Sequence, residues 1–403
     1  MHSELNTKAL IVISMVFCAD AVALAAPAWP TFRGNMQHTG YTSRTSYLAP
    51  VVNWCVPTSG SIAGSPVMNT SGTIFVASAS GHVCAYNRNG TRLWTYATSA
   101  AIFGSPTLGP DSMIYVGDLN GRLYAIRPNG SPYWTYTIAN GGRDARILQS
   151  PGVGPNGRIY VASWDGNVHC VAPNGSFQWM HSFGGLLTAS PAVDSTGTIY
   201  VVGYQGNDLR VRAIRPDGTT RWTYQRDMGA WSNGSNSTYI KSSVCVDQSR
   251  GRVYVGANCP IGGYLVCLKL NDGSEVSWAP LGRSIYSAPA VDPNGIVYFG
   301  ALDGCLYAYD PRMGTEQWHF QTDGQFILGS PLVDGNGYVY VGASDGCLYR
   351  VAPGGAESWR FATDSDVRST ALIDENGCLY FGSMDNHLYS IGGPSSVARW
   401  RKY

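Results

Sequence analysis

The chain has 403 residues, of which 49 are Gly and only 13% are charged, so uncharged groups must supply most of its polar surface. This composition argues against intrinsic disorder and coiled coils. The 27 Lys and Arg residues balance 26 Asp and Glu residues, and a formal charge of +1 leaves no basic excess to neutralise a phosphate backbone. We therefore expect no nucleic acid partner.

The start of the chain has the pattern of an export signal. Lys8 precedes a short apolar run over residues 9–17, and small residues follow at Ala23 and Ala25. We interpret residues 1–25 as a signal peptide, cleaved after Ala25 or Ala26. The run is too short to cross a bilayer, and no later stretch is long enough, so no transmembrane segment is expected. The mature protein should be exported, either to the periplasm or outside the cell.

Cys18 raises the question of a lipid anchor within the same segment. Phe17 precedes it, whereas a lipid-attachment signal usually has a small residue at that position. We therefore do not expect lipid anchoring at Cys18.

From residue 62 onward the sequence repeats one phrase eight times. Two copies are GSPTLGPDSMIYVGDLNGRLYAIRPNGSPYW and GSPLVDGNGYVYVGASDGCLYRVAPGGAESW. Every copy ends in a tryptophan, and these are Trp94, Trp134, Trp179, Trp222, Trp278, Trp318, Trp359 and Trp400. The period of roughly 40 residues is typical of repeat architectures built from small sheets. A further tryptophan, Trp54, precedes the first copy.

Each copy of the phrase predicts four short strands. The first contains Ser-Pro and an apolar pair, and the second is an aromatic and β-branched run such as residues 296–299. A hairpin turn of the Asp-Gly type leads to the third strand, and the fourth strand begins at the repeated tryptophan. The second strands are apolar on both faces, so each sheet must be covered by neighbours on both sides.

These features predict an all-β fold, an eight-bladed β-propeller of four-stranded antiparallel blades over residues 62–403. Residues 26–61 form an N-terminal lead-in with a possible ring-closing strand. Trp54 and Trp400 compete for the outer edge of the last blade, and the sequence leaves both open. We interpret the tryptophans from Trp94 to Trp359 as structural residues that fill the wedges between blades.

The cysteines favour the same structural interpretation. Nine of the ten would remain after cleavage, and an odd number cannot all pair with one another. Cys170 and Cys267 stand where other copies of the phrase carry Ala. We therefore expect most cysteines to be small apolar core residues.

One copy of the phrase carries a longer signature. Ala308, Asp310, Gly314 and Trp318 spell Ala-x-Asp-x-x-x-Gly-x-x-x-Trp, while copies such as residues 125–134 have a turn one residue shorter. With this signature the repeats resemble the PQQ-type, or quinoprotein, propeller family over nearly the whole mature chain. The segment WPTFRGNMQHTG, residues 29–40, resembles the lead-in of secreted members.

The resemblance leaves the function open, because the family contains both enzymes and non-enzymes. Enzymatic members hold the quinone PQQ and a calcium ion over the channel, beside a disulfide between adjacent cysteines. This chain has no adjacent cysteine pair and lacks the long insertions of those dehydrogenases. No cofactor is therefore expected, with PQQ and calcium as the alternative. The non-enzymatic members are similar to BamB, a compact scaffold that holds partners on exposed loops, and their length matches this chain.

In a propeller, the loops from each outer strand to the next inner strand share one face with the hairpins between second and third strands. On this loop face the chain departs most from its repeat, which favours a binding surface over plain solvated loops. The residues of this predicted partner face are Arg143, Asp144, Arg146, Trp164, Trp231, Tyr239, Lys241, Arg283, Tyr286, Asp364, Asp366 and Arg368.

Carboxylates recur near one rim of the same face, at Asp165, Asp303, Asp345 and Asp385, and could attract a cation. The sequence Asp-Gly is also what a tight hairpin turn requires, and it explains each of them except Asp385, which precedes Asn386. No metal site and no catalytic residues are predicted, since metalloprotease, nucleophile-elbow and phosphate-loop motifs are absent from the sequence.

The sequence thus favours an exported, non-catalytic, monomeric scaffold that binds a protein, a polysaccharide or another envelope or extracellular polymer through its loop face. Two alternatives stay open. One is a minimal PQQ-dependent dehydrogenase, and the other is a secreted carbohydrate-binding or carbohydrate-cleaving protein.

Overall fold

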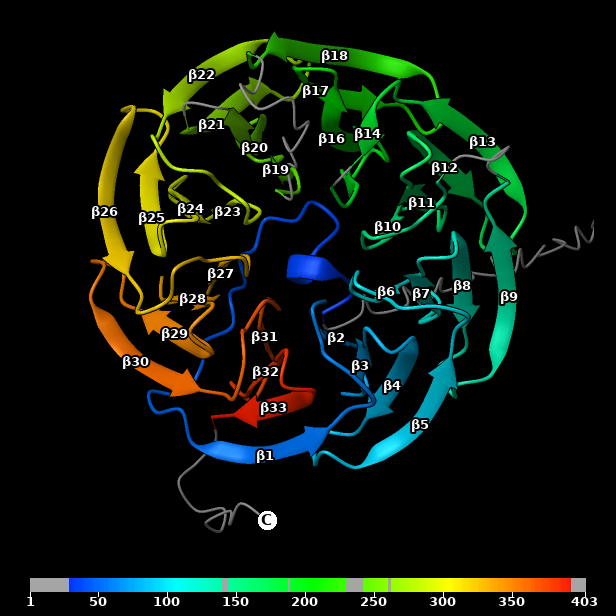
Figure 1. The fold of residues 1–403 in the computed structure, drawn as a ribbon, viewed down its shortest axis with the longest axis vertical. Helices are drawn as coiled ribbons and strands as arrows, with labels where there is room; N and C mark the ends of the chain where they lie inside the picture. The colour runs from blue at the N-terminus through cyan, green and yellow to red at the C-terminus, as the bar shows by residue number, and fades with distance from the viewer. Residues whose placement is uncertain (1–28, 140–143, 188, 230–241, 260–261, 393–403) are drawn as a thin grey trace, which may run out of the picture.

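The computed structural model describes residues 29–139, 144–187, 189–229, 242–259 and 262–392. Within them, eight antiparallel sheets stand around one axis like the blades of a propeller (Figure 1). The predicted eight-bladed, all-β fold is confirmed. The predicted signal peptide and Trp400 lie outside the described residues.

The first four blades follow one another in sequence order, and each runs from an inner to an outer strand. Blade 1 contains β2 (Val67–Met68), β3 (Ile74–Ala77), β4 (His82–Tyr86) and β5 (Arg92–Ala97). Blade 2 contains β6 (Thr107–Leu108), β7 (Ile114–Gly117), β8 (Arg122–Ile126) and β9 (Pro132–Thr137). Blade 3 contains β10 (Gly152–Val153), β11 (Ile159–Ala162), β12 (Asn167–Val171) and β13 (Phe177–Ser182). Blade 4 contains β15 (Ala192–Val193), β16 (Ile199–Gln205), β17 (Asp208–Ile214) and β18 (Thr220–Asp227), with the extra strand β14 (Leu186–Leu187) beside β16.

The remaining blades continue around the ring. Blade 5 contains β19 (Cys245–Asp247), β20 (Arg252–Cys259), β21 (Gly262–Lys269) and β22 (Glu275–Pro280). Blade 6 contains β23 (Ala290–Val291), β24 (Val297–Gly300), β25 (Cys305–Asp310) and β26 (Thr315–Gln321). Blade 7 contains β27 (Leu332–Val333), β28 (Val339–Gly342), β29 (Cys347–Val351) and β30 (Glu357–Ala362). Blade 8 contains β31 (Leu372–Ile373), β32 (Leu379–Gly382), β33 (His387–Ile391) and, as its outer strand, β1 (Val52–Pro57).

The burial of the strands follows the apolar pattern of the repeat. All four residues of β7 are buried, because both faces of the sheet are covered by adjacent blades. In the outer strand β9 exposed residues alternate with half-buried ones, as expected at the solvent-facing edge of a sheet.

The ring is closed by the N-terminal side of the chain. β1 pairs with β33 in antiparallel register, so blade 8 is built from both ends of the repeat region. Trp54 in β1 is buried, and its indole N–H donates to the carbonyl of Arg88 in blade 1 at 2.7 Å. Of the two candidates left open by the sequence, Trp54 forms this outer edge.

Five of the repeated tryptophans make the same contact between neighbouring blades. Each indole N–H donates to a carbonyl in the turn before the outer strand of the next blade, at 2.7–3.0 Å, from Trp94, Trp134, Trp179, Trp222 and Trp318. Each ring also covers the glycine of that turn. At Gly175, for example, φ is 87° and an added Cβ would lie 2.8 Å from the ring of Trp134. The turn therefore needs glycine for its backbone and for the indole.

Two of the predicted structural tryptophans differ from this set. Trp359 is buried, but its indole N–H has no partner in the part of the chain that the structure describes. The outer strand of the next blade, blade 8, is β1, so no direct turn leads into it from β33.

Trp278 makes a different contact from the five tryptophans above. It follows Cys267 by eleven positions, whereas Trp134 follows Ala125 by nine, and Ser277 takes the place opposite Cys267. A shift of one residue turns a side chain to the other face of its strand. Trp278 accordingly packs on Tyr264, with ring centroids 4.3 Å apart, and against Arg226 of the preceding blade. It therefore still packs between neighbouring blades, against blade 4 in place of blade 6.

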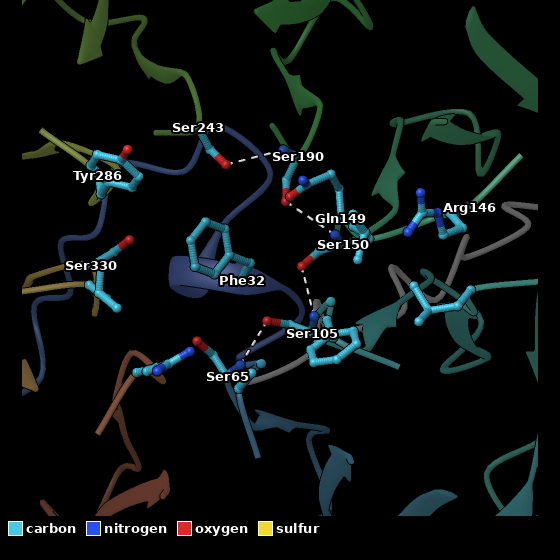
Figure 2. A pocket seen from close by; sticks show the side chains of 18 of the residues that line it. Phe32, Ser65, Ser105, Arg146, Gln149, Ser150, Ser190, Ser243, Tyr286 and Ser330 are labelled. Atoms are coloured by element: carbon cyan, nitrogen blue, oxygen red, sulfur yellow. Dashed lines mark hydrogen bonds between the residues drawn. The ribbon is translucent and has the colours of Figure 1, made fainter. Parts of the chain in front are cut away.

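A ring of hydroxyl groups joins the starts of the inner strands. At each contact a backbone N–H donates to the hydroxyl of the equivalent residue in the next blade, as from Ser105 to Ser150 at 2.8 Å (Figure 2). The same bond occurs in the pairs Ser65–Ser105, Ser150–Ser190, Ser190–Ser243, Ala288–Ser330 and Thr370–Ser65. We call this set the serine ring. It accounts for the recurrent Ser of the repeated phrase. Ala288 offers no hydroxyl to Ser243, and between Ser330 and Thr370 the hydroxyl of Thr370 donates to the carbonyl of Ser330 instead.

Nine cysteines lie among the described residues, and seven of them are buried. This arrangement agrees with their interpretation as core residues. No helix in the described part of the chain has the length and hydropathy needed to cross a bilayer.

The serine ring makes stability testable at two positions. Ser150→Ala leaves the buried N–H of Ser105 without an acceptor and should lower the free energy of unfolding by about 1–3 kcal/mol. Ala288→Ser supplies the missing acceptor for Ser243 and should raise it by about 0.5–1.5 kcal/mol. Denaturant unfolding followed by circular dichroism measures both changes. Shifts of the same sign in the two variants would contradict the role given to the ring.

Candidate functional site

A cavity of about 620 Å³ lies on the loop face, over the propeller axis. Its lining comes from three sources: Phe32 of the lead-in, the loops that connect successive blades, and the hairpin residues Leu119 and Trp164. Figure 2 shows Phe32 at its centre, between Tyr286 on one side and Arg146 on the other. We call this cavity the cup.

The floor of the cup is formed by the lead-in, which fills the channel. Residues 29–44, which include the short 3-10 helix η1 (Phe32–Gly34), cross the centre of the ring (Figure 1). Their backbone groups pair with the inner strands of six blades, through Met68, Leu108, Val193, Val246, Val291 and Val333. We call residues 29–44 the plug. It satisfies strand-edge groups that would otherwise face an open channel.

Two basic residues of the plug are buried next to the floor. Arg33 has no exposed surface, and it has left-handed backbone geometry with φ of 63°. Its guanidinium group donates to the carbonyl of Pro289, while Nε and Nη1 have no partner in the described part of the chain. Burial lowers the pKa of Arg33 to about 10, so the group stays charged at neutral pH.

His38 lies beside the floor as a neutral ring. Its imidazole meets the ring of Phe32 edge-on, with centroids 5.3 Å apart. Burial, followed by the positive charge of Arg33, lowers the pKa of His38 to about 3. The plug therefore buries the positive charge of Arg33, which makes no ion pair with the described residues, directly after the floor residue Phe32.

The wall of the cup comes from one position of the repeated phrase. Wherever it is described, the residue two places before a serine-ring position lines the cavity, and we call it the tip: Ala63, Phe103, Leu148, Tyr286, Leu328 and Arg368. The residue before each tip is an Ile or Val that is at most 1% exposed. Ile147, for example, fills the space above Gly117 of β7, where an added Cβ would lie 2.2 Å from its side chain. A buried anchor and the serine ring thus hold each tip from both sides.

The rim is fixed by hydrogen bonds between hairpins and loops. The backbone N–H of Trp164 donates to the carbonyl of Arg146 at 3.0 Å, and the backbone N–H of Leu119 donates to the carbonyl of Ala101. The guanidinium of Arg146 stacks over the ring of Trp164 at 4.4 Å and pairs with Asp144, while Arg368 pairs with Asp366. In each pair a carboxylate two residues earlier orients the arginine.

The structure brings together some of the predicted partner-face residues and not others. Arg146, Trp164, Tyr286 and Arg368 line the cup. Arg283 pairs instead with Asp303 and is 58% exposed, and the N–H of Asp364 donates to Asp385. Arg143, Trp231, Tyr239 and Lys241 lie outside the described residues.

Sequence reasoning missed the floor residue Phe32 and the tips Phe103, Leu148 and Leu328. The signal for the tips was available, because all of them stand at the same offset from the serine of the repeat. No signal in the sequence places Phe32 in the channel.

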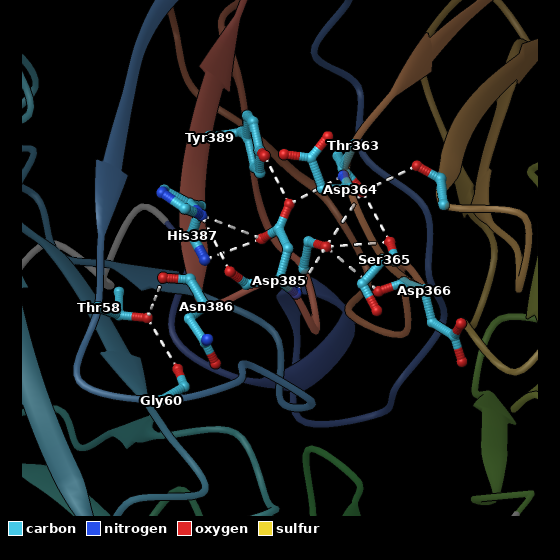
Figure 3. A network of polar contacts seen from close by, with 12 residues as sticks. Thr58, Gly60, Thr363, Asp364, Ser365, Asp366, Asp385, Asn386, His387 and Tyr389 are labelled. Carbon is cyan, nitrogen blue, oxygen red and sulfur yellow. Dashed lines mark hydrogen bonds and ion pairs between the residues drawn. The ribbon is translucent and has the colours of Figure 1, made fainter. Parts of the chain in front are cut away.

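The recurrent carboxylates of the rim are held by the fold itself. Asp303, Asp345 and Asp385 each accept a hydrogen bond of 2.6 Å from a tyrosine four residues later. Figure 3 shows Asp385 with its partners Tyr389, His387 and Asp364. Asn386 takes the place of the usual turn glycine with φ of 70°, which explains the one aspartate that the Asp-Gly pattern left open.

Asp165 departs from this arrangement, because the residue four positions later is His169. The two side chains are buried and 2.9 Å apart. No group of three or more His, Cys, Asp or Glu side chains among the described residues is arranged to hold a metal ion.

Comparison with known families decides the affiliation of the chain. The model of the family described as outer membrane protein assembly factor BamB matches residues 51–150, 120–258 and 229–402. The chain belongs to this family. No curated protein sequence matches it.

Solved structures of BamB and of quinoprotein dehydrogenases share the fold. BamB from Moraxella catarrhalis is 20% identical, with a TM-score of 0.69 over 86% of this chain and 100% of that one. A europium-containing methanol dehydrogenase is 14% identical, with a TM-score of 0.74 over 91% of this chain and 98% of that one. The quinohemoprotein alcohol dehydrogenase of Comamonas testosteroni is 16% identical, with a TM-score of 0.76 over 95% of this chain and 83% of that one. At these identities the likeness shows the fold and leaves the chemistry to the site.

The cup does not fit a calcium ion with a bound quinone. Calcium takes oxygen ligands, carboxylates above all, and none of the described side chains that line the cup is a carboxylate. None of them is a cysteine that could form the adjacent disulfide of the enzymes. Arg146 and Arg368 could pair with acidic groups of a quinone, but the ligands for its metal are missing from this lining.

Because His38 stays neutral in the folded protein, stability should depend on pH in a defined direction. In the unfolded chain His38 binds a proton near pH 6.5, whereas in the folded chain it does so only near pH 3. Its contribution is therefore present above pH 6.5 and is lost as the pH falls, by at most about 1.4 kcal/mol per pH unit.

His38→Asn tests this contribution, since Asn tolerates the left-handed backbone at this position. Denaturant unfolding between pH 7.5 and pH 4.5 should give a shallower loss of stability in the variant than in the wild type. Parallel pH profiles for the two proteins would contradict the assignment.

Proposed function

We propose that the chain is an exported, non-catalytic scaffold that binds a protein partner through the cup and its rim. The observation that carries this proposal is the tip position. Its side chain changes from blade to blade, from Ala63 to Phe103 to Arg368, while the anchors and most of the serine ring stay the same. Variation confined to one position on a constant frame is what a recognition surface requires.

The frame of the cup is suited to binding with little rearrangement. Buried anchors, the serine ring and the plug hold the tips before any partner arrives, which reduces the entropy lost on association. Phe103 and Phe326 in the loops of this face are 38% and 39% exposed. Aromatic and arginine side chains are the residues enriched at the centres of protein interfaces, and both types occur here.

The family and the first residues of the chain support the proposal that the protein is exported to the outer envelope. The family is named for outer membrane protein assembly, and we extend to this chain a location in the periplasm or outside the cell. The mature protein would then begin a few residues before Trp29, whose backbone pairs with Met68. We propose no lipid anchor, and we propose a monomer.

The maturation step can be checked by mass. After expression in a bacterial host that exports proteins, the intact mass of the exported form should correspond to a chain beginning at Ala26 or Pro27, with no acyl group. An Ala25→Arg variant should keep the precursor mass, because a bulky charged residue blocks the cleavage site. Full-length wild-type protein confined to the cytoplasm would contradict export.

The partner face can be tested with matched variants. Phe103→Asp together with Leu328→Asp places two charges in the wall, and should reduce capture of an envelope protein at least ~10-fold, as expected for central interface residues. Leu93→Asp is the control, since Leu93 is 51% exposed on the outer strand β5, away from the cup. Capture is measured by affinity purification with quantitative mass spectrometry. Equal capture by wild type and the double variant would overturn the proposal.

The dehydrogenase alternative has its own measurement. Two of the similar folds belong to quinoprotein dehydrogenases, so the purified chain should be titrated with PQQ and calcium. We expect no change in melting temperature and no alcohol- or sugar-dependent dye reduction, because the lining lacks metal ligands. Dye reduction that requires both PQQ and calcium would show that the chain is a dehydrogenase and would contradict the scaffold proposal.

A further inference from the structure

We propose that the cup binds an apolar or aromatic group that carries a carboxylate, either a small free acid or the C-terminal residue of a polypeptide. The inference deepens the proposed function and rests on it for the second of these two sources. Three independent features of the described residues lead to it: the hydrogen-bonding character of the lining, the charge beneath the floor, and the apolar wall.

The serine ring turns hydrogen-bond donors toward the axis. In the ring the oxygen atoms of Ser105, Ser150 and Ser190 each accept a backbone N–H, so each hydroxyl keeps its own proton to donate. All three residues line the cup. Each hydroxyl can therefore donate to a ligand that carries acceptor oxygens.

The two arginines of the lining also keep donors. Arg146 and Arg368 contact their aspartates through Nε and Nη2, and the Nη1 group of each makes no further hydrogen bond to the described residues. A carboxylate is the planar acceptor that a guanidinium group recognises best. Asp144 and Asp366 occupy the other nitrogen atoms of these groups and lie outside the lining, so each arginine offers its Nη1 group to a ligand.

The buried positive charge of Arg33 also favours an anionic ligand. Arg33 is buried and makes no ion pair with the described carboxylates, so its positive charge is balanced by no side chain nearby. Phe32, the floor residue, is its neighbour in the chain. In a buried environment an uncompensated charge acts over a longer distance than in water, and it favours an anion in the cavity above.

The wall accounts for the apolar part of the ligand. Phe32, Phe103, Leu148 and Leu328 surround the cavity, whose volume of about 620 Å³ suits a small molecule or a terminal residue and excludes a folded domain. An inorganic anion would leave this wall without a partner.

The decisive experiment compares an acid with its neutral amide. Isothermal titration of the full mature protein with N-acetyl-L-phenylalanine and with N-acetyl-L-phenylalanine amide should give affinities at least ~10-fold higher for the acid. A ten-residue peptide ending in Phe, prepared with a free or an amidated C-terminus, forms the second arm. Tighter binding of the free peptide than of the small acid assigns the cup to polypeptide ends, and the reverse order assigns it to small acids.

Variants separate the charged from the apolar contribution. Arg368→Met should abolish most of the preference for acid over amide, and Phe103→Ala should weaken the binding of both. Arg215→Met is the control, because Arg215 is exposed in the turn between β17 and β18, on the face opposite the cup. It should leave both affinities unchanged.

Two results would overturn the inference: equal affinities for acid and amide, or no binding of any of the four probes at millimolar concentration. If an envelope protein is still captured in either case, the proposed scaffold function stands although the cup does not recognise a carboxylate. If the acids bind and no protein is captured, the cup is a small-molecule site and the scaffold function fails instead.

Discussion

The structure depends on the burial of both faces of every blade. The central strands are apolar on both sides, as β7 shows with four buried residues, so no blade can be stable with an uncovered neighbour. Only a closed ring removes every uncovered face. Closure explains why β1 lies beside β33 although more than 300 residues separate them, and why Trp54 contacts blade 1 through Arg88. Closure also confines sequence variation to the loops, because any change within a blade would disturb its interfaces with both neighbouring blades.

Closure creates a second problem at the axis, where the inner strands end in unpaired backbone groups. Two devices solve it at different heights. The serine ring connects neighbouring strands where they begin, and the plug pairs with them further along the channel. Together they turn an open channel into a cup with a floor. The rigidity of the cup is therefore a consequence of satisfying the inner strands, and the tips, which stand between an anchor such as Ile147 and the ring, share that rigidity.

The blades could be predicted because the information for them is local. Turn residues, apolar runs and the recurrent tryptophan repeat at nearly constant spacing, and each copy confirms the others. The sequence left open what depends on distant contacts or on the length of a single turn. Two extra positions between Cys267 and Trp278 reversed the direction of that indole, and nothing near Trp54 or Trp400 decided which would meet β33. For the cup, departures from the repeat revealed Arg146, Trp164, Tyr286 and Arg368, whereas the tip Phe103 was not singled out and Phe32 required knowledge of the plug.

A shared fold with both BamB and quinoprotein dehydrogenases makes the polarity of the site more informative than its position. A metal-bound quinone needs acceptor oxygens to hold the cation, whereas the cup presents hydroxyl and guanidinium protons above the buried charge of Arg33. Replacing acceptor oxygens by donor groups in the cup requires no change in the blades, since each tip is one side chain on a fixed frame. A propeller can therefore move between holding a cation and holding an anion through substitutions at a few tips and in the plug, while the burial that stabilises its ring is left untouched.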